Sequence, residues 1–179
     1  PSDVPSDPGA YSQEHVVNDL YLLLKHLDID CAHIGGLSMG GSVALNFGIA
    51  HPEMARSLIV ASAGSGSDNR DTFLSNGQAI VDRLQSEGME VVANEYGRAD
   101  IRLQLERKDP QGFDEFLRLL ASHSAVGSAL TFRGFVMNRP TVYALEDKLR
   151  SIQVPTLIMI GDEDEPCIEP AVFMKRNIP

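Results

Sequence analysis

The strongest constraint in the sequence is a glycine-rich turn, Gly36-Leu37-Ser38-Met39-Gly40, placed between a strand-like run and a helical pattern. The strand-like run covers residues 31–36, and the helical pattern covers residues 42–50 and ends at His51-Pro52. A sharp strand-to-helix turn strains the backbone of its central residue, so the residues two positions away on either side must be small. The sequence therefore predicts that Ser38 lies at the strained centre of such a turn. Gly41 adds room for close packing of the helix against a strand.

Three apolar runs of strand length alternate with helical patterns along the chain. The second and third runs cover residues 57–62 and 156–160. Continuous apolar runs of this length are typical of parallel strands that are buried on both faces. The order is helix, strand, helix, strand, helical insertion, strand. This order predicts an α/β fold in which helices flank a parallel sheet.

A helix is predicted ahead of the first strand. Ser12 is a suitable N-cap and Glu14 falls in the first turn. The apolar residues that follow are spaced to share one helical face: Val16, Leu20, Leu23, Leu24 and Leu27. Residues 1–9 are rich in Pro, Ser and Asp and are expected to form a loop.

Helical spacing dominates between the second and third strands. The stretch begins with Gly64-Ser65-Gly66-Ser67, which we expect to be flexible. Its large apolar residues either line a substrate pocket over Ser38 or, as we favour, form the core of the insertion itself; they are Phe113, Phe116, Phe132, Phe135 and Met137. We therefore expect a sheet-containing core at residues 1–63 and 150–179, with a helical insertion at residues 64–149.

The composition excludes several classes of partner. The chain has 15 Lys and Arg against 25 Asp and Glu, a formal net charge of −10, so binding to nucleic acid or to an anionic membrane surface is not expected. It contains neither a run of about 18 apolar residues nor a secretory signal pattern. Cys31 and Cys167 lack the spacing of a metal or redox site and are expected to be reduced thiols of a cytoplasmic protein.

The glycine-rich turn does not fit a nucleotide site. It lacks the G-K-[ST] ending of a phosphate loop, and the glycines of residues 35–40 are not spaced as in a dinucleotide fingerprint. No cofactor and no metal are therefore expected. The turn does match G-x-S-x-G, in which the serine is a nucleophile and the helix N-terminus faces an oxyanion. The alternative is a glycine-rich turn with an incidental serine.

Four stretches together resemble the α/β-hydrolase family, in the branch with a helical cap and a serine nucleophile. They are Tyr11-Ser12-Gln13-Glu14, Gly36-Leu37-Ser38-Met39-Gly40-Gly41, Ala50-His51-Pro52-Glu53 and residues 154–164. The resemblance covers nearly the whole chain. It implies an eight-stranded core sheet of which this chain holds the fifth to the seventh strand, so that both ends of the fold are absent.

The resemblance implies roles for three residues. Ser38 is similar in position to the nucleophile, and Met39 to the second donor of the oxyanion hole. The acid of the triad follows the seventh strand in a Gly-x-x-Asp pattern, which Asp164 completes, and Asp162 is the competing candidate. The alternative for these acids is a solvated turn that caps a helix near residues 169–175.

A Ser-His-Asp mechanism also needs a histidine after the acid. No histidine follows Asp164 in this sequence, which contains His15, His26, His33, His51 and His123. His123, in the insertion, is a weak candidate for the base, and the others are expected to be structural or solvated. We therefore expect a fragment that is inactive alone, with its histidine beyond Pro179 and its first oxyanion donor upstream of Pro1.

The expected function is hydrolysis of small carboxylic esters or lactones through an acyl-enzyme, as in esterases and enol-lactonases. Serine at position 38 argues against the haloalkane dehalogenase and epoxide hydrolase branches, for which the resemblance would imply an aspartate nucleophile. Carbon-carbon bond hydrolases and perhydrolases keep the serine and stay open. A non-catalytic ligand-binding protein or an inactive remnant on the same fold is the rival from another class.

Overall fold

The structure is a computed structural model that describes residues 3–179 apart from the side chain of Ile101; Pro1 and Ser2, the first residues of the expected loop, lie outside the described residues. The chain forms two compact units. The sheet unit comprises Ser12–Arg70 and Arg139–Pro179, and the helical unit comprises Asp71–Asn138 with the described part of Pro1–Tyr11. The expected boundaries at 63/64 and 149/150 stay a prediction.

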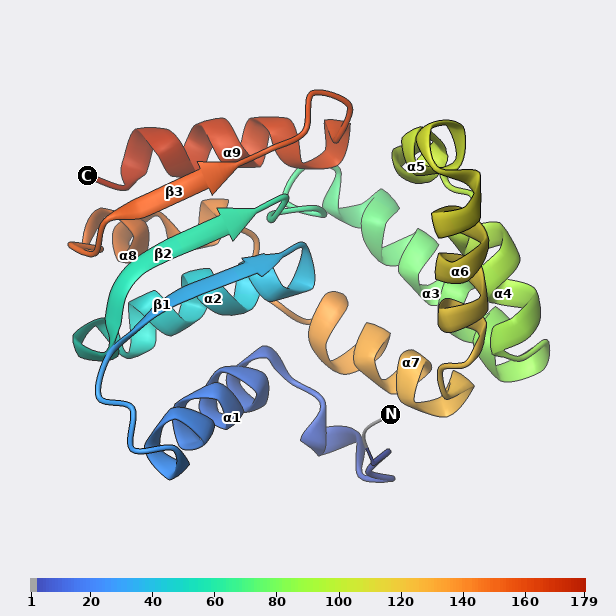
Figure 1. Cartoon of the computed structure of the whole chain (residues 1–179), viewed down its shortest axis with the longest axis horizontal. Coiled ribbons are helices and arrows are strands. Elements are labelled where there is room, and N and C mark those ends of the chain that lie inside the picture. Colours follow the sequence, from blue (N-terminus) through green and yellow to red (C-terminus); the bar gives the residue numbers. More distant parts are fainter. Residues whose placement is uncertain (1–2) are drawn as a thin grey trace. The chain divides into compact units, whose positions relative to one another are not determined.

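Three parallel strands form the sheet, as predicted. They are β1 (Ala32–Leu37), β2 (Ala55–Ala61) and β3 (Thr156–Met159), and they lie in the order β1-β2-β3 (Figure 1). Leu37, Ala61 and Met159 are paired in one row across the sheet, so all three strands end at the same edge. The chain segments that follow each strand are therefore neighbours at this carboxyl edge.

The remaining elements of the sheet unit are helical. They are α1 (Gln13–His26), α2 (Met39–Ala50), α8 (Glu146–Arg150), α9 (Glu165–Asn177) and two 3-10 turns, Pro52–Met54 and Tyr143–Leu145. α2 packs against both β1 and β2, and α1 packs against α2. The helical pattern after the first strand thus begins at Met39, immediately after Ser38, and α9 begins four residues before the range expected for it.

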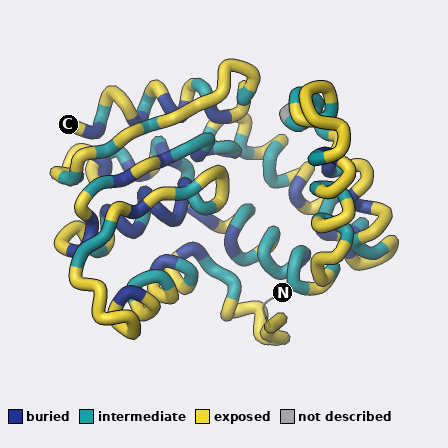
Figure 2. Tube along the Cα trace, viewed as in Figure 1, coloured by how far each residue is buried: buried dark blue, intermediate teal, exposed yellow. Residues whose placement is uncertain are grey.

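The sheet is buried on one face only, so the prediction that its strands are buried on both faces is wrong. Ile34, Leu58 and Val60 are buried on one side. The exposed fractions of strand residues elsewhere are 67% for Leu37, 38% for Ile59, 54% for Leu157 and 50% for Met159. Figure 2 shows this exposure along β3, which contains no buried residue.

The chain order of the strands explains the one-sided burial. β1, β2 and β3 are parallel and follow one another across the sheet in a single direction. Crossovers between parallel strands are right-handed, so two crossovers that advance in the same direction place their helices on the same face. The crossovers therefore cover one face and leave the other without a helix from β1 through β3.

α1 begins as predicted, but its buried face differs from the predicted one. The Ser12 hydroxyl accepts a hydrogen bond from the His15 N–H, which confirms the N-cap. The buried residues are Gln13, Val17 and Leu24, and the expected face members Leu23 and Leu27 are 52% and 54% exposed. The helix presents a narrower buried face than its run of leucines indicates, because it is a surface helix that packs mainly on α2.

The middle of the chain is helical, as predicted, and contains no strand among the described residues 64–149. Its elements are α3 (Arg70–Ser86), α4 (Met89–Gly97), a 3-10 turn at Asp100–Arg102, α5 (Leu103–Lys108), α6 (Pro110–Ala121), α7 (Ala125–Thr131) and a π-helical turn at Phe132–Val136. A further 3-10 turn, Pro8–Ala10, belongs to the same unit.

The aromatic residues of the insertion belong to the core of the helical unit. Phe113 and Phe135 are 1% and 2% exposed. Phe132 and Met137 pack against a buried cluster formed by Val81, Leu84, Val92 and Ala129. This arrangement confirms the interpretation that these side chains are mainly a core of their own.

The exposed sheet face makes self-association of the 179-residue chain the expected behaviour. The double substitution Leu157→Glu and Met159→Glu places charge on the exposed face. It should reduce association without lowering the free energy of unfolding. Val60→Glu, on the buried face, should instead unfold the chain, because it buries an unpaired charge. Sedimentation velocity and urea unfolding measure the two effects, and a monomeric wild-type chain would contradict the first expectation.

Candidate functional site

Ser38 lies in the strained turn that the sequence predicts. It connects the last residue of β1 to the first residue of α2 and has φ 55° and ψ −111°. A Cβ atom at Gly36 would lie 2.3 Å from the carbonyl carbon and oxygen of Gly40, so a side chain at position 36 would open the turn. A Cβ atom at Gly40 would meet no atom within 4 Å, so the requirement for a small side chain holds at position 36 and not at position 40.

The turn is fixed to the end of β2. The Ser38 N–H donates to the Ala61 carbonyl at 2.8 Å. A Cβ atom at Gly41 would lie 2.7 Å from the same carbonyl oxygen, so glycine allows α2 to approach β2 closely, as predicted. These contacts place the exposed Ser38 at the carboxyl edge of the sheet.

Met39 is the first residue of α2, and its side chain is 41% exposed. The first N–H groups of a helix have no acceptor within the helix, and the partial positive charge of the helix N-terminus favours an anion there. This position suits a donor to an oxyanion that forms beside Ser38. The role of Met39 nevertheless stays a prediction.

Asp164 differs from its acidic neighbours in burial. Its side chain is half-buried, whereas Asp162, Glu163 and Glu165 are exposed. Asp164 occupies the N-cap position of α9, but its carboxylate makes no capping hydrogen bond. Helix capping therefore does not explain why an acidic residue stands at this position. The carboxylate instead acts on the thiol of Cys167: burial chiefly, and then the negative charge of Asp164, raise the pKa of Cys167 to about 12.

Ser38 and Asp164 reach the same edge of the sheet from strands that flank β2. Ser38 follows β1 directly, and Asp164 follows β3 by five residues. Neighbouring strands lie about 4.8 Å apart, so the ends of β1 and β3 are separated by about 10 Å.

Two histidines of the sheet unit lie far from Ser38. His33 precedes it by five residues on β1, about 16 Å at the rise of a strand, and its Nδ1 hydrogen-bonds the Ser57 hydroxyl at 2.7 Å. His51 follows α2, about 20 Å away at the rise of a helix, and its ring stacks on Tyr21 with the centroids 4.4 Å apart. Neither can act as the base of Ser38.

The other histidines lie on α1 and in the helical unit. His15 Nδ1 hydrogen-bonds the Ser12 hydroxyl at 2.8 Å at the start of α1, and His26 is exposed in the last turn of that helix. His123 is exposed in the helical unit. These environments agree with the expectation that His15 and His26 are structural or solvated, and the weak candidacy of His123 for the base stays a prediction.

Comparison with known families identifies the relationship. A family described as "Serine aminopeptidase, S33" matches residues 9–172. The chain belongs to this family. The resemblance to α/β hydrolases that the sequence carries is thereby confirmed, together with the predicted fold class.

The proteins to which this chain is similar carry names of several different activities. The 3-oxoadipate enol-lactonase 1 of Acinetobacter baylyi is 27% identical over 169 residues, 92% of this chain and 59% of the enol-lactonase. MenH from S. aureus has a TM-score of 0.86 at 22% identity, over 99% of this chain and 67% of that chain. A thermophilic esterase from Thermogutta terrifontis has a TM-score of 0.79 at 26% identity, over 98% of this chain and 63% of that chain. The chain spans between 24% and 62% of the length of the curated relatives it matches.

The segment that follows β2 is held in place, and the expectation of a flexible Gly64–Ser67 stretch is wrong. Gly64 and Gly66 are buried, and the Ser67 hydroxyl accepts a hydrogen bond from the Val142 N–H at 3.0 Å. Sequence reasoning also missed the buried Arg139, which bonds this segment. The glycine and serine content of the 64–67 segment suggests mobility, and no local sequence pattern indicates a hydrogen-bond partner more than 70 residues away.

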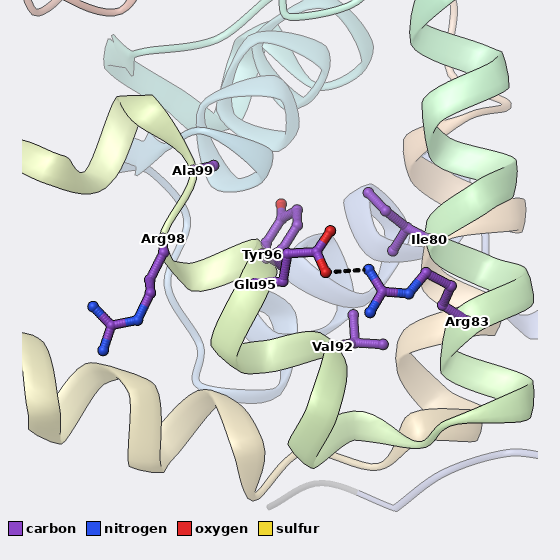
Figure 3. Close-up of a pocket in the computed structure, with 7 residues that line it drawn as sticks. All are labelled: Ile80, Arg83, Val92, Glu95, Tyr96, Arg98 and Ala99. Carbon is purple, nitrogen blue, oxygen red and sulfur yellow. Dashed lines mark ion pairs between the residues drawn. The ribbon is translucent and has the colours of Figure 1, made fainter.

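A separate pocket of about 390 Å³ lies in the helical unit (Figure 3). Its walls come from α3, α4 and the residues just after α4: Ile80, Arg83, Val92, Glu95, Tyr96, Arg98 and Ala99. Arg83 points across it to Glu95, at 2.6 Å, and also bonds Glu87 at 2.9 Å. The hydrogen bonds to Glu87 and then to Glu95 raise the pKa of Arg83. Arg98 pairs with Glu106. The cations of this pocket are engaged by carboxylates, and none of Ser38, Met39 and Asp164 lines it.

The described residues contain no group of three or more potential metal ligands, and none of their helices has the length and apolar character to cross a membrane.

The strain at Ser38 predicts opposite results for two substitutions. Ser38→Gly should raise the free energy of unfolding by about 1 kcal/mol, because glycine adopts positive φ without steric strain. Ser38→Ala keeps the Cβ atom and should leave stability within about 0.5 kcal/mol of wild type. Urea unfolding of both variants checks this, and equal stabilities would show that the turn is not strained.

Alkaline pH should destabilise the protein through Cys167. The native thiol keeps its proton up to about pH 12, whereas the unfolded thiol loses it near pH 9. Between these values the unfolded state binds fewer protons, so the free energy of unfolding falls as pH rises. Urea unfolding at pH 7, 9 and 10.5 should show this decline and a shallower one in Cys167→Ala. The same slope in both proteins would contradict the prediction.

Proposed function

We propose that the protein is a serine hydrolase that cleaves small carboxylic esters or lactones, with Ser38 as nucleophile, the Met39 N–H as oxyanion donor and Asp164 as the acid. The observation that carries the proposal is the backbone of Ser38, held at φ 55° between a strand and a helix by the contact of Gly36 with Gly40. Strain of this kind persists where it presents a reactive side chain. A small-molecule substrate is consistent with membership of the family.

The proposed reaction has two steps. The Ser38 Oγ attacks the carbonyl carbon while its proton passes to an imidazole. The tetrahedral oxyanion then accepts a hydrogen bond from the Met39 N–H. The carbon–oxygen bond breaks, the imidazolium protonates the leaving alkoxide, and an acyl-Ser38 ester remains. Water, deprotonated by the same imidazole, then releases the carboxylic acid and restores the Ser38 hydroxyl. Asp164 orients the imidazole and stabilises its charged form.

The base in this proposal is a histidine from sequence that follows Pro179 in the complete protein, and the first oxyanion donor comes from sequence before Pro1. The relatives are longer than this chain, which spans 59% of the enol-lactonase and 63% of the esterase chain. The chain alone is then expected to turn over substrate very slowly, because the loss of an oxyanion donor by itself lowers the rate by about 10²- to 10³-fold.

The choice of ester and lactone substrates is supported by two relatives. The enol-lactonase matches 92% of this chain, and the esterase from Thermogutta terrifontis matches 98% of it at 26% identity. Carbon-carbon bond hydrolysis and perhydrolysis would use the same serine and the same acid, so product analysis separates them from ester cleavage. A non-catalytic binding protein is distinguished from a hydrolase by a Ser38 hydroxyl that does not react with a serine-directed probe.

The decisive experiment is fluorophosphonate labelling of the complete protein with mass-spectrometric assignment of the labelled residue. Label is expected on Ser38, and Ser38→Ala should lose both the label and the hydrolysis of short-chain esters and lactones by at least about 10³-fold. Asp164→Asn should lower kcat by about 10³- to 10⁴-fold, because it leaves the imidazole without its orienting charge. Ser122→Ala, which changes an exposed serine of the helical unit, is the matched control and should behave as wild type.

Two results would overturn the proposal. A complete protein that hydrolyses esters but carries its label on another residue would exclude Ser38 as the nucleophile. A complete protein that folds, takes no label and cleaves neither esters nor lactones would favour the non-catalytic binding protein.

A further inference from the structure

The loop that follows β2 has an unusual backbone. This β2 loop, residues 62–69, has positive φ at Ser62 (47°), Gly64 (108°), Gly66 (80°) and Asn69 (39°). Gly64 has no room for a side chain, because a Cβ atom there would lie 2.5 Å from the Cβ of Pro170 on α9. Contacts with the rest of the protein therefore hold the loop in a conformation that is unfavourable for its backbone alone.

Two arginines bond the β2 loop from outside. The guanidinium of Arg139, on a residue only 8% exposed, donates from Nη2 to both the carbonyl and the hydroxyl of Ser65, each at 3.0 Å. Arg70 Nη2 donates to the Arg139 carbonyl at 2.9 Å, and Arg70 Nη1 donates to the Gly66 carbonyl at 3.4 Å. Arg139 thus joins the loop to the segment that returns from the helical unit.

One side of the β2 loop adjoins the turn that holds Ser38. The loop begins at the residue after Ala61, whose carbonyl accepts the Ser38 N–H. Ala63 is buried at the start of the loop, and its Cβ would lie 3.1 Å from a Cβ atom at Gly41. A shift of the loop would therefore move the atoms that hold Ser38 in place.

The other side of the β2 loop adjoins the segment that holds Asp164. The Cys167 thiol lies 3.6 Å from the Ser62 carbonyl, to which it donates, and the Ser65 backbone also bonds this thiol. The Cys167 N–H donates to the Asp164 carbonyl at 2.9 Å. Asp164 and Arg139 act on the same sulfur with opposite sign: the carboxylate raises the pKa of Cys167 and the guanidinium lowers it.

We propose that Arg139 is a positioning residue for this site: by bonding Ser65 it holds the β2 loop in the conformation that keeps the Ser38 turn and the Asp164 turn in register. The proposal rests on the proposed function for its catalytic consequence. The mechanical part concerns only the loop, and it is tested separately through Cys167.

The first experiment measures how fast 5,5′-dithiobis(2-nitrobenzoic acid) modifies Cys167 in the complete protein, with Cys31 as the internal reference. Arg139→Gln should raise the Cys167 rate by about 10-fold or more, because release of the loop exposes the thiol. Loss of the positive charge alone would have the opposite effect, since it lowers the thiolate fraction and slows the reaction. An unchanged or lower rate therefore overturns the proposal.

Two further variants guard against a general loss of structure. Arg139→Lys should give an intermediate rate, because an ammonium does not reproduce the planar set of donors that guanidinium offers to Ser65. Arg150→Gln, which changes an exposed arginine of the sheet unit, should leave the rate at the wild-type value. A rise in the Cys31 rate of Arg139→Gln to the same extent would show unfolding of the sheet unit and overturn the proposal.

The second experiment measures hydrolysis by the same variants. Arg139→Gln should lower kcat by about 10- to 100-fold with KM within about 3-fold of wild type, and Arg139→Lys should restore part of kcat. A faster thiol reaction with unchanged kcat would overturn the positioning role. A wild-type protein without hydrolase activity would overturn the proposed function instead, while the thiol rates still decide whether Arg139 holds the loop.

Discussion

The contact between Gly36 and Gly40 is the constraint on which the site depends. A Cβ atom at position 36 would lie only 2.3 Å from the carbonyl carbon and oxygen of Gly40, so this close approach is possible only because residue 36 is glycine. The chain can therefore reverse from strand to helix within one residue, and the left-handed backbone of Ser38 is the consequence. The same turn starts α2 at the residue after the serine, so one steric condition positions both Ser38 and the first N–H groups of the helix.

The direction of the sheet explains where that site can be. Because β1, β2 and β3 advance across the sheet in one direction, the segments after them meet at one edge, and their crossovers cover one face. Ser38 and the β2 loop follow the ends of β1 and β2 directly, and Asp164 follows the end of β3 by five residues. Burial by α2 on one face anchors the strands, while the opposite face carries exposed Leu157 and Met159.

The features that follow from local rules could be predicted from the sequence, and those that depend on distant partners could not. The turn at Ser38, the N-cap Ser12 and the positions of the strands depend on neighbours within a few residues. The apolar run of β2 predicts burial of both faces, which is wrong, because such a run does not reveal whether a second layer of helices is present. The buried face of α1 likewise depends on a distant partner, since the leucines outnumber those that α2 covers.

The β2 loop shows why composition misleads about mobility. Glycine and serine lower the barrier to many conformations in an open chain, yet a buried segment must still satisfy each N–H and carbonyl group. A backbone with repeated positive φ cannot pair as a strand or a helix, so donors have to come from elsewhere. Guanidinium groups suit this task, because each presents several donors in a plane and stays charged without depending on pH. Arg139 and Arg70 supply those donors to Ser65 and Gly66, and the permissive residues of the loop are what allow its carbonyls to turn toward them.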